Sequence, residues 1–377
     1  MAADFGVVYP LWDVAADEGC LLERVVGEVG VDHLTIPVVT GAQTQFRLGS
    51  GGDAPHFHTE GGWHFRARTK AYTGTTLRPP KGRWFASGDV LAEMRERATG
   101  LDVRLFVRVD VRAVRALVDQ ERHLCQRNAW GQEVPFAGAC ASNPDLRELL
   151  RATLEDLHRY EPAGCELVDW VPDCAANRSS ARPLSWHADA RHLLDICFCA
   201  SCRQIAQRAG VDADQAARSV RVHVERVTSP GGGGQTQSEA DPVIAAYVAA
   251  RRADCAAWLQ QLAEGGGQDC HYLLMRTLGE PPLSGSAPWV RLARLPAAGG
   301  HGAETDPVAL LRASLAELSA VSLPVWHPRF GEAAELVRLV SEAVQEGVKI
   351  FDFEGLNEAA PDAVTWLKQA VRFARRG

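Results

Sequence analysis

Short apolar runs alternate along this chain with longer segments in which apolar residues recur at helical spacing. A short run that is apolar on both faces is typical of a parallel strand covered by helices. Such runs occupy residues 5–9, 33–39, 103–109, 165–169, 270–275, 289–295, 323–326 and 348–353. The helical segments are residues 23–29, 90–98, 143–160, 202–210, 212–227, 241–264, 307–318, 332–345 and 360–375. This alternation predicts an α/β fold, a (β/α)8 TIM barrel that takes up residues 1–377 as a single domain.

An open, doubly wound sheet is the alternative to a barrel. No Gly-rich dinucleotide fingerprint follows the first predicted strand, and this favours the barrel. Residues 40–88 exceed an ordinary loop in length, and such excursions are usually functional, so we expect this one near the barrel mouth. The glycine run within residues 229–240 predicts a flexible surface loop.

Charge and hydropathy exclude two classes of partner. The net charge of −7 argues against nucleic acid, because duplex binding depends on Lys and Arg that neutralise phosphates. No uninterrupted apolar stretch is long enough to predict a membrane span. The first residues have neither a basic segment nor a long apolar one, so we expect no signal peptide and a cytoplasmic protein.

Three cysteines stand close together at Cys197, Cys199 and Cys202. Thiolates at this spacing can converge on one Zn²⁺, which needs four ligands. Two upstream residues can supply the fourth: Cys140, just before a predicted helix, and Cys174, which is nearer in sequence. A site saturated with thiolates has no open position for substrate, so we expect a structural zinc ion.

Several short stretches, spread in order over nearly the whole chain, carry a family resemblance. They are Tyr9-Pro10-x-Trp12-Asp13, Arg127-Asn128-Ala129-Trp130-Gly131, Cys140-x-x-Asn143-Pro144-x-x-Arg147, Leu193-Leu194-x-x-Cys197-Phe198-Cys199-x-x-Cys202-Arg203 and Phe353-Glu354-Gly355-Leu356. The set resembles the zinc-binding pattern of family-42 β-galactosidases, and more closely a group of uncharacterised bacterial TIM-barrel proteins related to glycoside hydrolases. The resemblance implies a barrel with a four-cysteine zinc site, Cys140 as the fourth ligand, a carbohydrate ligand and a possible homo-oligomer.

The chain departs from these relatives where their catalytic acids stand. Val168 takes the place of a glutamate that the close relatives carry, and residues 175–181 replace their histidine-rich stretch. Trp326 and His327 stand at the seventh strand, where retaining relatives have a nucleophilic carboxylate. Either the acid has moved to Asp169 or Glu166, or this chain has lost ordinary hydrolase chemistry.

Barrel active sites are built at the C-terminal ends of the strands. Glycosidic cleavage needs two carboxyl groups, and the plausible pairs join Asp169 or Glu166 to Asp352 or Glu354. We favour Asp169 as the acid/base, because it stands at the extreme end of its strand. The side chains expected to bind substrate at this mouth are Trp12, Asp13, Arg108, Asn128, Trp170, Arg276, Trp326 and His327.

The sequence thus predicts a glycoside-hydrolase-like protein that acts on a carbohydrate or another small polar ligand. The alternative is a catalytically degenerate barrel that binds a sugar or a protein. A third possibility is a metal-dependent isomerase or lyase that uses His56, His58, Glu60 and His64 as ligands. Trp63 and Trp130 are candidates for sugar-stacking platforms or for core residues.

Overall fold

The computed structural model describes residues 3–12, 20–46, 56–82, 88–134, 137–170, 193–229, 241–264, 270–277, 290–294, 307–325, 332–356 and 362–376. In this part of the chain, no helix is both long enough and apolar enough to cross a membrane.

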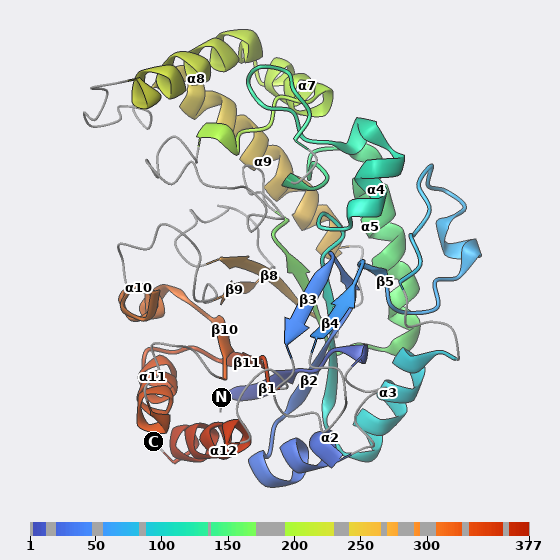
Figure 1. Cartoon of the computed structure of the whole chain (residues 1–377), viewed down its shortest axis with the longest axis vertical. Coiled ribbons are helices and arrows are strands. Elements are labelled where there is room, and N and C mark those ends of the chain that lie inside the picture. The colour runs from blue at the N-terminus through green and yellow to red at the C-terminus, as the bar shows by residue number, and fades with distance from the viewer. Residues whose placement is uncertain are drawn as a thin grey trace.

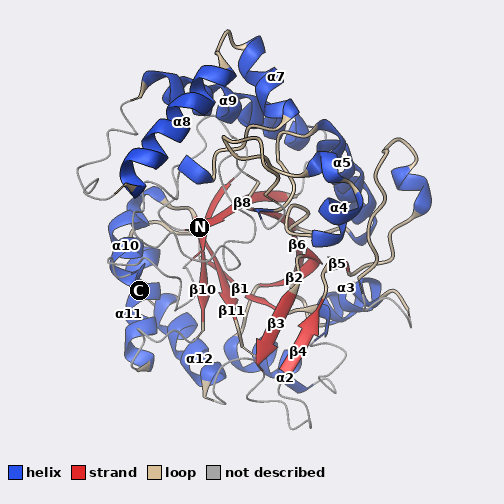
Figure 2. Ribbon diagram, turned by 45° about the horizontal axis from the view of Figure 1, so that its top comes forward, coloured by secondary structure: helices blue, strands red, loops and turns tan. Residues whose placement is uncertain are grey.

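Parallel strands form the centre of the molecule. They are β1 (Asp4–Val8), β2 (His33–Thr40), β6 (Arg104–Val109), β7 (Gly164–Val168), β8 (His271–Thr277), β9 (Val290–Arg294), β10 (Ala320–Pro324) and β11 (Ile350–Glu354). Their order is β1-β11-β10-β9-β8-β7-β6-β2, and β1 also pairs in parallel with β2. The sheet therefore curls into a TIM-like barrel with helices around it (Figure 2).

Helices follow most of these strands in the chain. They are α2 (Cys20–Arg24), its continuation η1 (Val25–Val29), α3 (Val90–Gly100), α4 (Arg115–Gln120), α5 (Pro144–Leu157), α7 (Ala200–Arg208), α8 (Ala213–Thr228), α9 (Pro242–Glu264), α10 (Pro307–Ser314), α11 (Ala333–Gln345) and α12 (Ala363–Ala374). Single turns are η2 (Thr69–Tyr72), η4 (Arg122–Leu124), η6 (His158–Tyr160) and η9 (Leu315–Glu317). The connection from β8 to β9 lies outside the described residues.

The excursion after β2 contains more regular structure than its sequence predicts. The strands β3 (Gln43–Phe46) and β4 (His56–Thr59) pair antiparallel in a two-stranded sheet of their own, drawn in blue in Figure 1. Next comes β5 (Gly62–Trp63), which pairs antiparallel with the end of β2. Residues 230–240, most of the expected flexible loop, lie outside the described residues.

One predicted strand was misplaced. The seventh barrel strand is β10, which covers Ala320–Pro324 and not residues 323–326. The buried hydroxyl of Ser322 interrupts the apolar run, and this is why the sequence pattern pointed too far along the chain.

The barrel has an apolar outer layer and a partly polar interior. Side chains on the outer faces of the strands pack with the helices in the main core, as Leu167 and Phe351 do. Inside the barrel, Phe106, Val168 and Met275 belong to a small apolar cluster. Barrel interiors are usually filled with branched apolar side chains. Buried polar groups there cost free energy unless they are paired, so they mark a candidate site.

Candidate functional site

A chain of hydrogen-bonded polar side chains runs through the barrel interior. Strand alternation turns these side chains inward, while their sequence neighbours enter the outer core. The members are Asp4 of β1, His33 and Thr35 of β2, Arg108 of β6, Glu166 of β7, Ser322 of β10, and Asp352 and Glu354 of β11.

Arg108 joins two carboxyl groups at the end of this hydrogen-bonded series that lies toward the C-terminal ends of the strands. Its Nε donates to Glu166 Oε2 over 2.5 Å, and its Nη1 donates to Glu354 Oε1 over 2.6 Å. Ser322 Oγ donates to the same oxygen of Glu354. Among the described residues, Nη2 of Arg108 has no hydrogen-bond partner. One guanidinium thus holds two carboxyl groups, and its remaining nitrogen is buried.

Asp352 lies one step deeper and connects the two ends of the chain. Its Oδ1 accepts from Thr35 Oγ1 at 2.7 Å and from His33 Nε2 at 3.2 Å. Thr35 also contacts Glu166 Oε1, at 3.5 Å. Asp352 Oδ2 has no donor among the described residues when both carboxyl groups are ionised. A protonated Glu166 can supply that donor.

His33 fills the bottom of the barrel because Gly6 leaves room for it. A Cβ on Gly6 would lie only 2.0 Å from Nε2 of the imidazole. The other ring nitrogen, Nδ1, lies 2.9 Å from Asp4 Oδ1. The ring of Phe106 stacks on the imidazole with centroids 4.3 Å apart. His33 therefore has a carboxylate at each nitrogen and no contact with solvent.

The environment sets different protonation states for the members of this chain. Burial raises the pKa of Glu166 well above its ordinary value, although Arg108 opposes the shift. Burial alone would also raise the pKa of Asp352, but hydrogen bonds with Glu166 and His33 and the charge of His33 bring it below its ordinary value. For His33, burial favours the neutral ring, but hydrogen bonds to Asp352 and Asp4 raise its pKa to about 9. These shifts favour the protonated form of Glu166 and the charged forms of Asp352 and His33.

The predicted catalytic residues fall into two groups. Glu166, Asp352 and Glu354 meet in the interior chain. Asp169 follows β7 directly with a left-handed φ of 48°, and its carbonyl accepts a hydrogen bond from Arg112. The structure does not join Asp169 to the Arg108 carboxylates through any described hydrogen bond.

The predicted substrate-binding residues are spread more widely, and only Arg108 belongs to the interior chain. Trp12 is buried against His64, with ring centroids 5.4 Å apart, and Trp170 is buried against Trp258 at 5.3 Å. Asn128 is half-buried and closes a turn, and its Oδ1 accepts from the backbone N–H groups of Trp130 and Gln132. Asp13, Trp326 and His327, and the side chain of Arg276, lie outside the described residues.

Sequence reasoning missed four members of the interior chain: Asp4, His33, Thr35 and Ser322. A signal was present in β2, where His33 and Thr35 stand two positions apart and so share one face of an apolar strand. Nothing in the sequence indicated that this face meets Asp352, which lies more than three hundred residues further along the chain.

Two histidines of the excursion, His58 and His64, lie in separate environments, and the side chain of His56 lies outside the described residues. His58 is exposed and its Nδ1 pairs with Thr44 Oγ1 at 3.0 Å. His64 is buried and its Nε2 pairs with Thr40 Oγ1 at 2.8 Å, while burial lowers its pKa to about 4. Trp63 is a core residue, whereas Trp130 is 40% exposed. Among the described residues, the cysteine group is the one set that could hold a metal ion, so this loop offers no described metal site.

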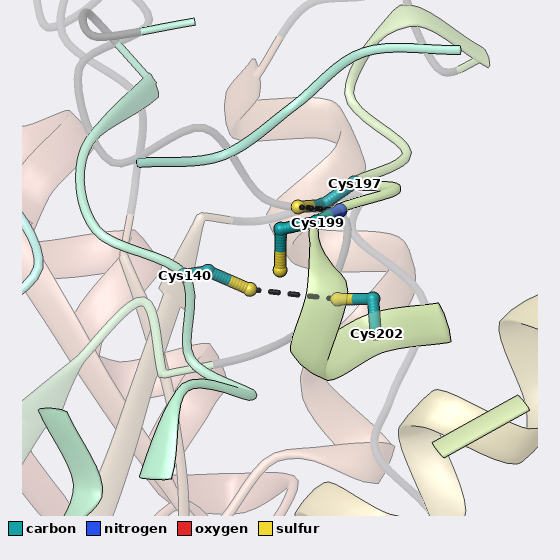
Figure 3. Close-up of side chains that lie close together, drawn as sticks. All are labelled: Cys140, Cys197, Cys199 and Cys202. Carbon is teal, nitrogen blue, oxygen red and sulfur yellow. Dashed lines mark hydrogen bonds between the residues drawn. The ribbon is translucent and has the colours of Figure 1, made fainter. Parts of the chain in front are cut away.

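Four cysteine side chains converge on one point (Figure 3). Cys140 comes from the segment before α5, and Cys197, Cys199 and Cys202 come from the turn that opens α7. Their sulfur atoms all lie within 4.8 Å of one another, and those of Cys140 and Cys202 are 3.5 Å apart. Cys140 thus joins the trio, as expected, and Cys174 lies outside the described residues.

This arrangement fits a tetrahedral metal ion. With metal–sulfur bonds of about 2.3 Å, the sulfur atoms of such a site lie about 3.8 Å apart. The backbone N–H groups of Arg127 and Cys199 both point at Cys197 Sγ from 3.4 Å, as expected around a metal-bound thiolate. All four residues are buried in a small separate core with parts of α7, α8 and α9. Four buried sulfur donors can therefore hold one metal ion.

Comparisons with known proteins agree on the fold alone. No family model matches this chain, and no curated protein matches it by sequence. Among solved structures, it is similar to α-L-fucosidase isoenzyme 2 from Paenibacillus thiaminolyticus, with a TM-score of 0.57 and 12% identity over 99% of this chain. The chain spans about half, 49%, of that fucosidase. A chitinase from Bacteroides thetaiotaomicron gives a TM-score of 0.47 and 8% identity, covering 100% of this chain and 96% of the chitinase. The similarity to the fucosidase therefore supports the TIM-like barrel fold and nothing beyond it.

Proposed function

We propose that this protein is a glycoside-hydrolase-like enzyme that acts on a carbohydrate by carboxylate acid/base catalysis at the C-terminal mouth of the barrel. The observation that carries the proposal is the Arg108 guanidinium, which binds Glu166 and Glu354 at once. Sharing one guanidinium keeps the two carboxyl groups within the upper limit for glycosidase pairs, roughly 9.5 Å.

The two carboxyl groups have the different environments that the reaction requires. Glu166 is fully buried, and burial favours its protonated form, so it is suited to protonate a leaving group. Glu354 ends β11, has 15% of its side chain exposed, and accepts hydrogen bonds from Arg108 and Ser322, which favour its ionised form. Glu354 is therefore the candidate nucleophile or base.

A screen of aryl glycosides and oligosaccharides tests this proposal. With a substrate in hand, we expect Glu166→Gln and Glu354→Gln each to lower kcat/KM by roughly 10²–10⁴-fold, because each removes a proton-transfer or charge-stabilising group. Asp169→Asn should change it by less than about tenfold. Glu148→Gln, on the exposed face of α5, is the matched control.

Two outcomes would contradict these roles. A large loss in Asp169→Asn with full activity in Glu166→Gln would transfer the acid function to Asp169. Turnover of no glycoside at all would favour the second candidate function, a binding barrel. The complete burial of Glu166 and Asp352 is the observation that favours this second candidate.

We also propose that the metal ion held by the four cysteines is structural zinc. Zinc is the common occupant of tetrahedral four-thiolate sites, and four protein ligands leave no position for substrate. The cysteines would hold the segment before α5 against the start of α7, and the ion would supply no chemistry to the carboxylates of the barrel.

A further inference from the structure

We infer that His33 is a positioning residue that fixes the proton of the buried carboxyl pair on Glu166, by holding Asp352 ionised from the bottom of the barrel. The inference rests on the proposed function only for its consequence, namely that Glu166 is the acid. The spectroscopic state that it describes exists whether or not a glycoside is cleaved.

The first step is the proton count. The buried side chains of Glu166 and Asp352 share one neighbour, Thr35 Oγ1, which lies 3.5 Å from Glu166 Oε1 and 2.7 Å from Asp352 Oδ1. Two ionised carboxylates this close and this deeply buried would repel each other, and Asp352 Oδ2 is buried with no donor among the described residues. One proton shared by the pair satisfies both observations, and the open question is which carboxyl group carries it.

The second step concerns the charges on either side of the pair. Glu166 faces Arg108 of β6, Thr35 of β2 and, across β8, the apolar Leu273. Arg108 already serves a second carboxylate, Glu354, so its charge is divided between the two. By itself, the hydrogen bond from Arg108 still favours an ionised Glu166, so without His33 the proton would pass to Asp352.

The third step is His33, which acts on Asp352 alone. Its Nε2 lies 3.2 Å from Asp352 Oδ1 and its Nδ1 lies 2.9 Å from Asp4 Oδ1, so both nitrogens donate and the ring is an imidazolium. Asp4 in turn pairs with Arg104 at the lower end of β6. The ring has no solvent contact, so its charge acts on Asp352 with little screening. Asp352 therefore stays ionised and the proton stays on Glu166.

Infrared spectroscopy of the full chain with residue-specific labelling tests the inference. A protonated carboxyl group has a carbonyl stretch that is separate from carboxylate bands, and ¹³C in either glutamate or aspartate identifies its owner. Near pH 7 we expect a protonated-carboxyl band in the wild type that shifts with ¹³C-glutamate and disappears in Glu166→Gln. In His33→Gln, which keeps a polar side chain but no charge, the band should shift with ¹³C-aspartate.

A second variant provides the same test at Asp4, the partly exposed carboxylate on the other side of His33. Asp4→Asn removes one of the two carboxylates that hold the imidazolium, so the ring should lose its proton at a lower pH. In the wild type the band should pass from glutamate to aspartate near pH 9, where His33 titrates, and in Asp4→Asn this change should come at lower pH. His271→Gln is the control, because this exposed histidine lies 6.3 Å from the same Phe106 ring and faces solvent.

Three results would overturn the inference. They are a wild-type band that belongs to aspartate, a wild type with no protonated carboxyl group near pH 7, and a glutamate band that keeps its identity in both His33→Gln and Asp4→Asn. Failure of the glycoside screen would leave all of these measurements unchanged, so the two proposals fail separately.

Discussion

At the scale of single residues, the most demanding position is His33, a cation that is sealed inside the barrel. A buried charge is tolerated only when it is paired and hydrogen-bonded, and His33 has Asp4 on one nitrogen and Asp352 on the other. His64 represents the opposite solution. It is buried without a carboxylate partner in the described structure, and it stays neutral.

These two histidines predict opposite dependences of stability on pH. The pKa of His33 is about 9 in the folded protein against an ordinary 6.5, so its contribution is complete below pH 6.5 and is lost as pH rises to about 9. The pKa of His64 is about 4, so the unfolded chain takes up the proton first, and stability is lost as pH falls from 6.5 to about 4. Each histidine changes the free energy of unfolding by on the order of 3 kcal/mol over its pH range.

Urea unfolding from pH 4 to pH 9 measures both effects. We expect His33→Gln to remove most of the loss on the alkaline side, and His64→Gln to remove most of the loss on the acid side. Parallel curves for the wild type and both variants would show that neither ring has the charge state assigned here.

Gly6 predicts a severe defect from the smallest possible substitution. In Gly6→Ala the new Cβ would lie 2.0 Å from Nε2 of His33, so the ring must leave its place between two carboxylates. Breaking a buried ion pair typically costs about 3–5 kcal/mol, and we expect a loss of that order in the free energy of unfolding. Gly27→Ala is the matched control, since nothing lies within 4 Å of its Cβ and helical alanine is favourable. Equal unfolding midpoints for the two variants would contradict the location of the ring.

At the scale of secondary-structure elements, most of the barrel could be predicted from local patterns. The helix α5 shows why: Asn143 accepts from the N–H groups of Asp145 and Leu146, and Pro144 occupies the first turn, as their order in the sequence suggests. The pattern failed where polar residues enter buried strands, as Ser322 does in β10. The same property hid the candidate site, because a polar residue in an apolar run weakens the strand signal.

Strand alternation carried part of the site but could not assemble it. It correctly predicted that Asp352 and Glu354 share one face, and that Glu166 and Val168 share one face. It could not show that Arg108 joins Glu166 to Glu354, because those pairs depend on the register between strands that are distant in sequence. The preference for Asp169 came from its terminal position alone, without the hydrogen bonds that distinguish Glu166.

At the scale of the whole molecule, the cysteine cluster ties a second core to the barrel. The segment before α5 and the turn that opens α7 meet at the four sulfur atoms, with Tyr247 Oη of α9 donating to the carbonyl of Cys197 over 2.9 Å. Phe198 stacks on Tyr247 with centroids 4.7 Å apart. This core is small, so a metal ion would supply much of the free energy that holds it together.

The metal centre leads to a prediction about composition and stability together. We expect the purified protein to contain about one zinc ion per chain, and Cys199→Ser to lose it, because three thiolates bind zinc far more weakly than four. Structural zinc sites in small domains contribute roughly 10–16 kcal/mol of binding energy, so we expect α7 and α8 to become susceptible to protease and the thermal midpoint to fall.

Cys125→Ala, which alters a buried cysteine outside the cluster, should keep the metal. Elemental analysis, thermal unfolding and limited proteolysis of the three proteins measure these outcomes. A metal-free wild type, or a Cys199→Ser variant as stable and protease-resistant as the wild type, would contradict a structural role for the ion, because the second core would then hold together by apolar packing alone.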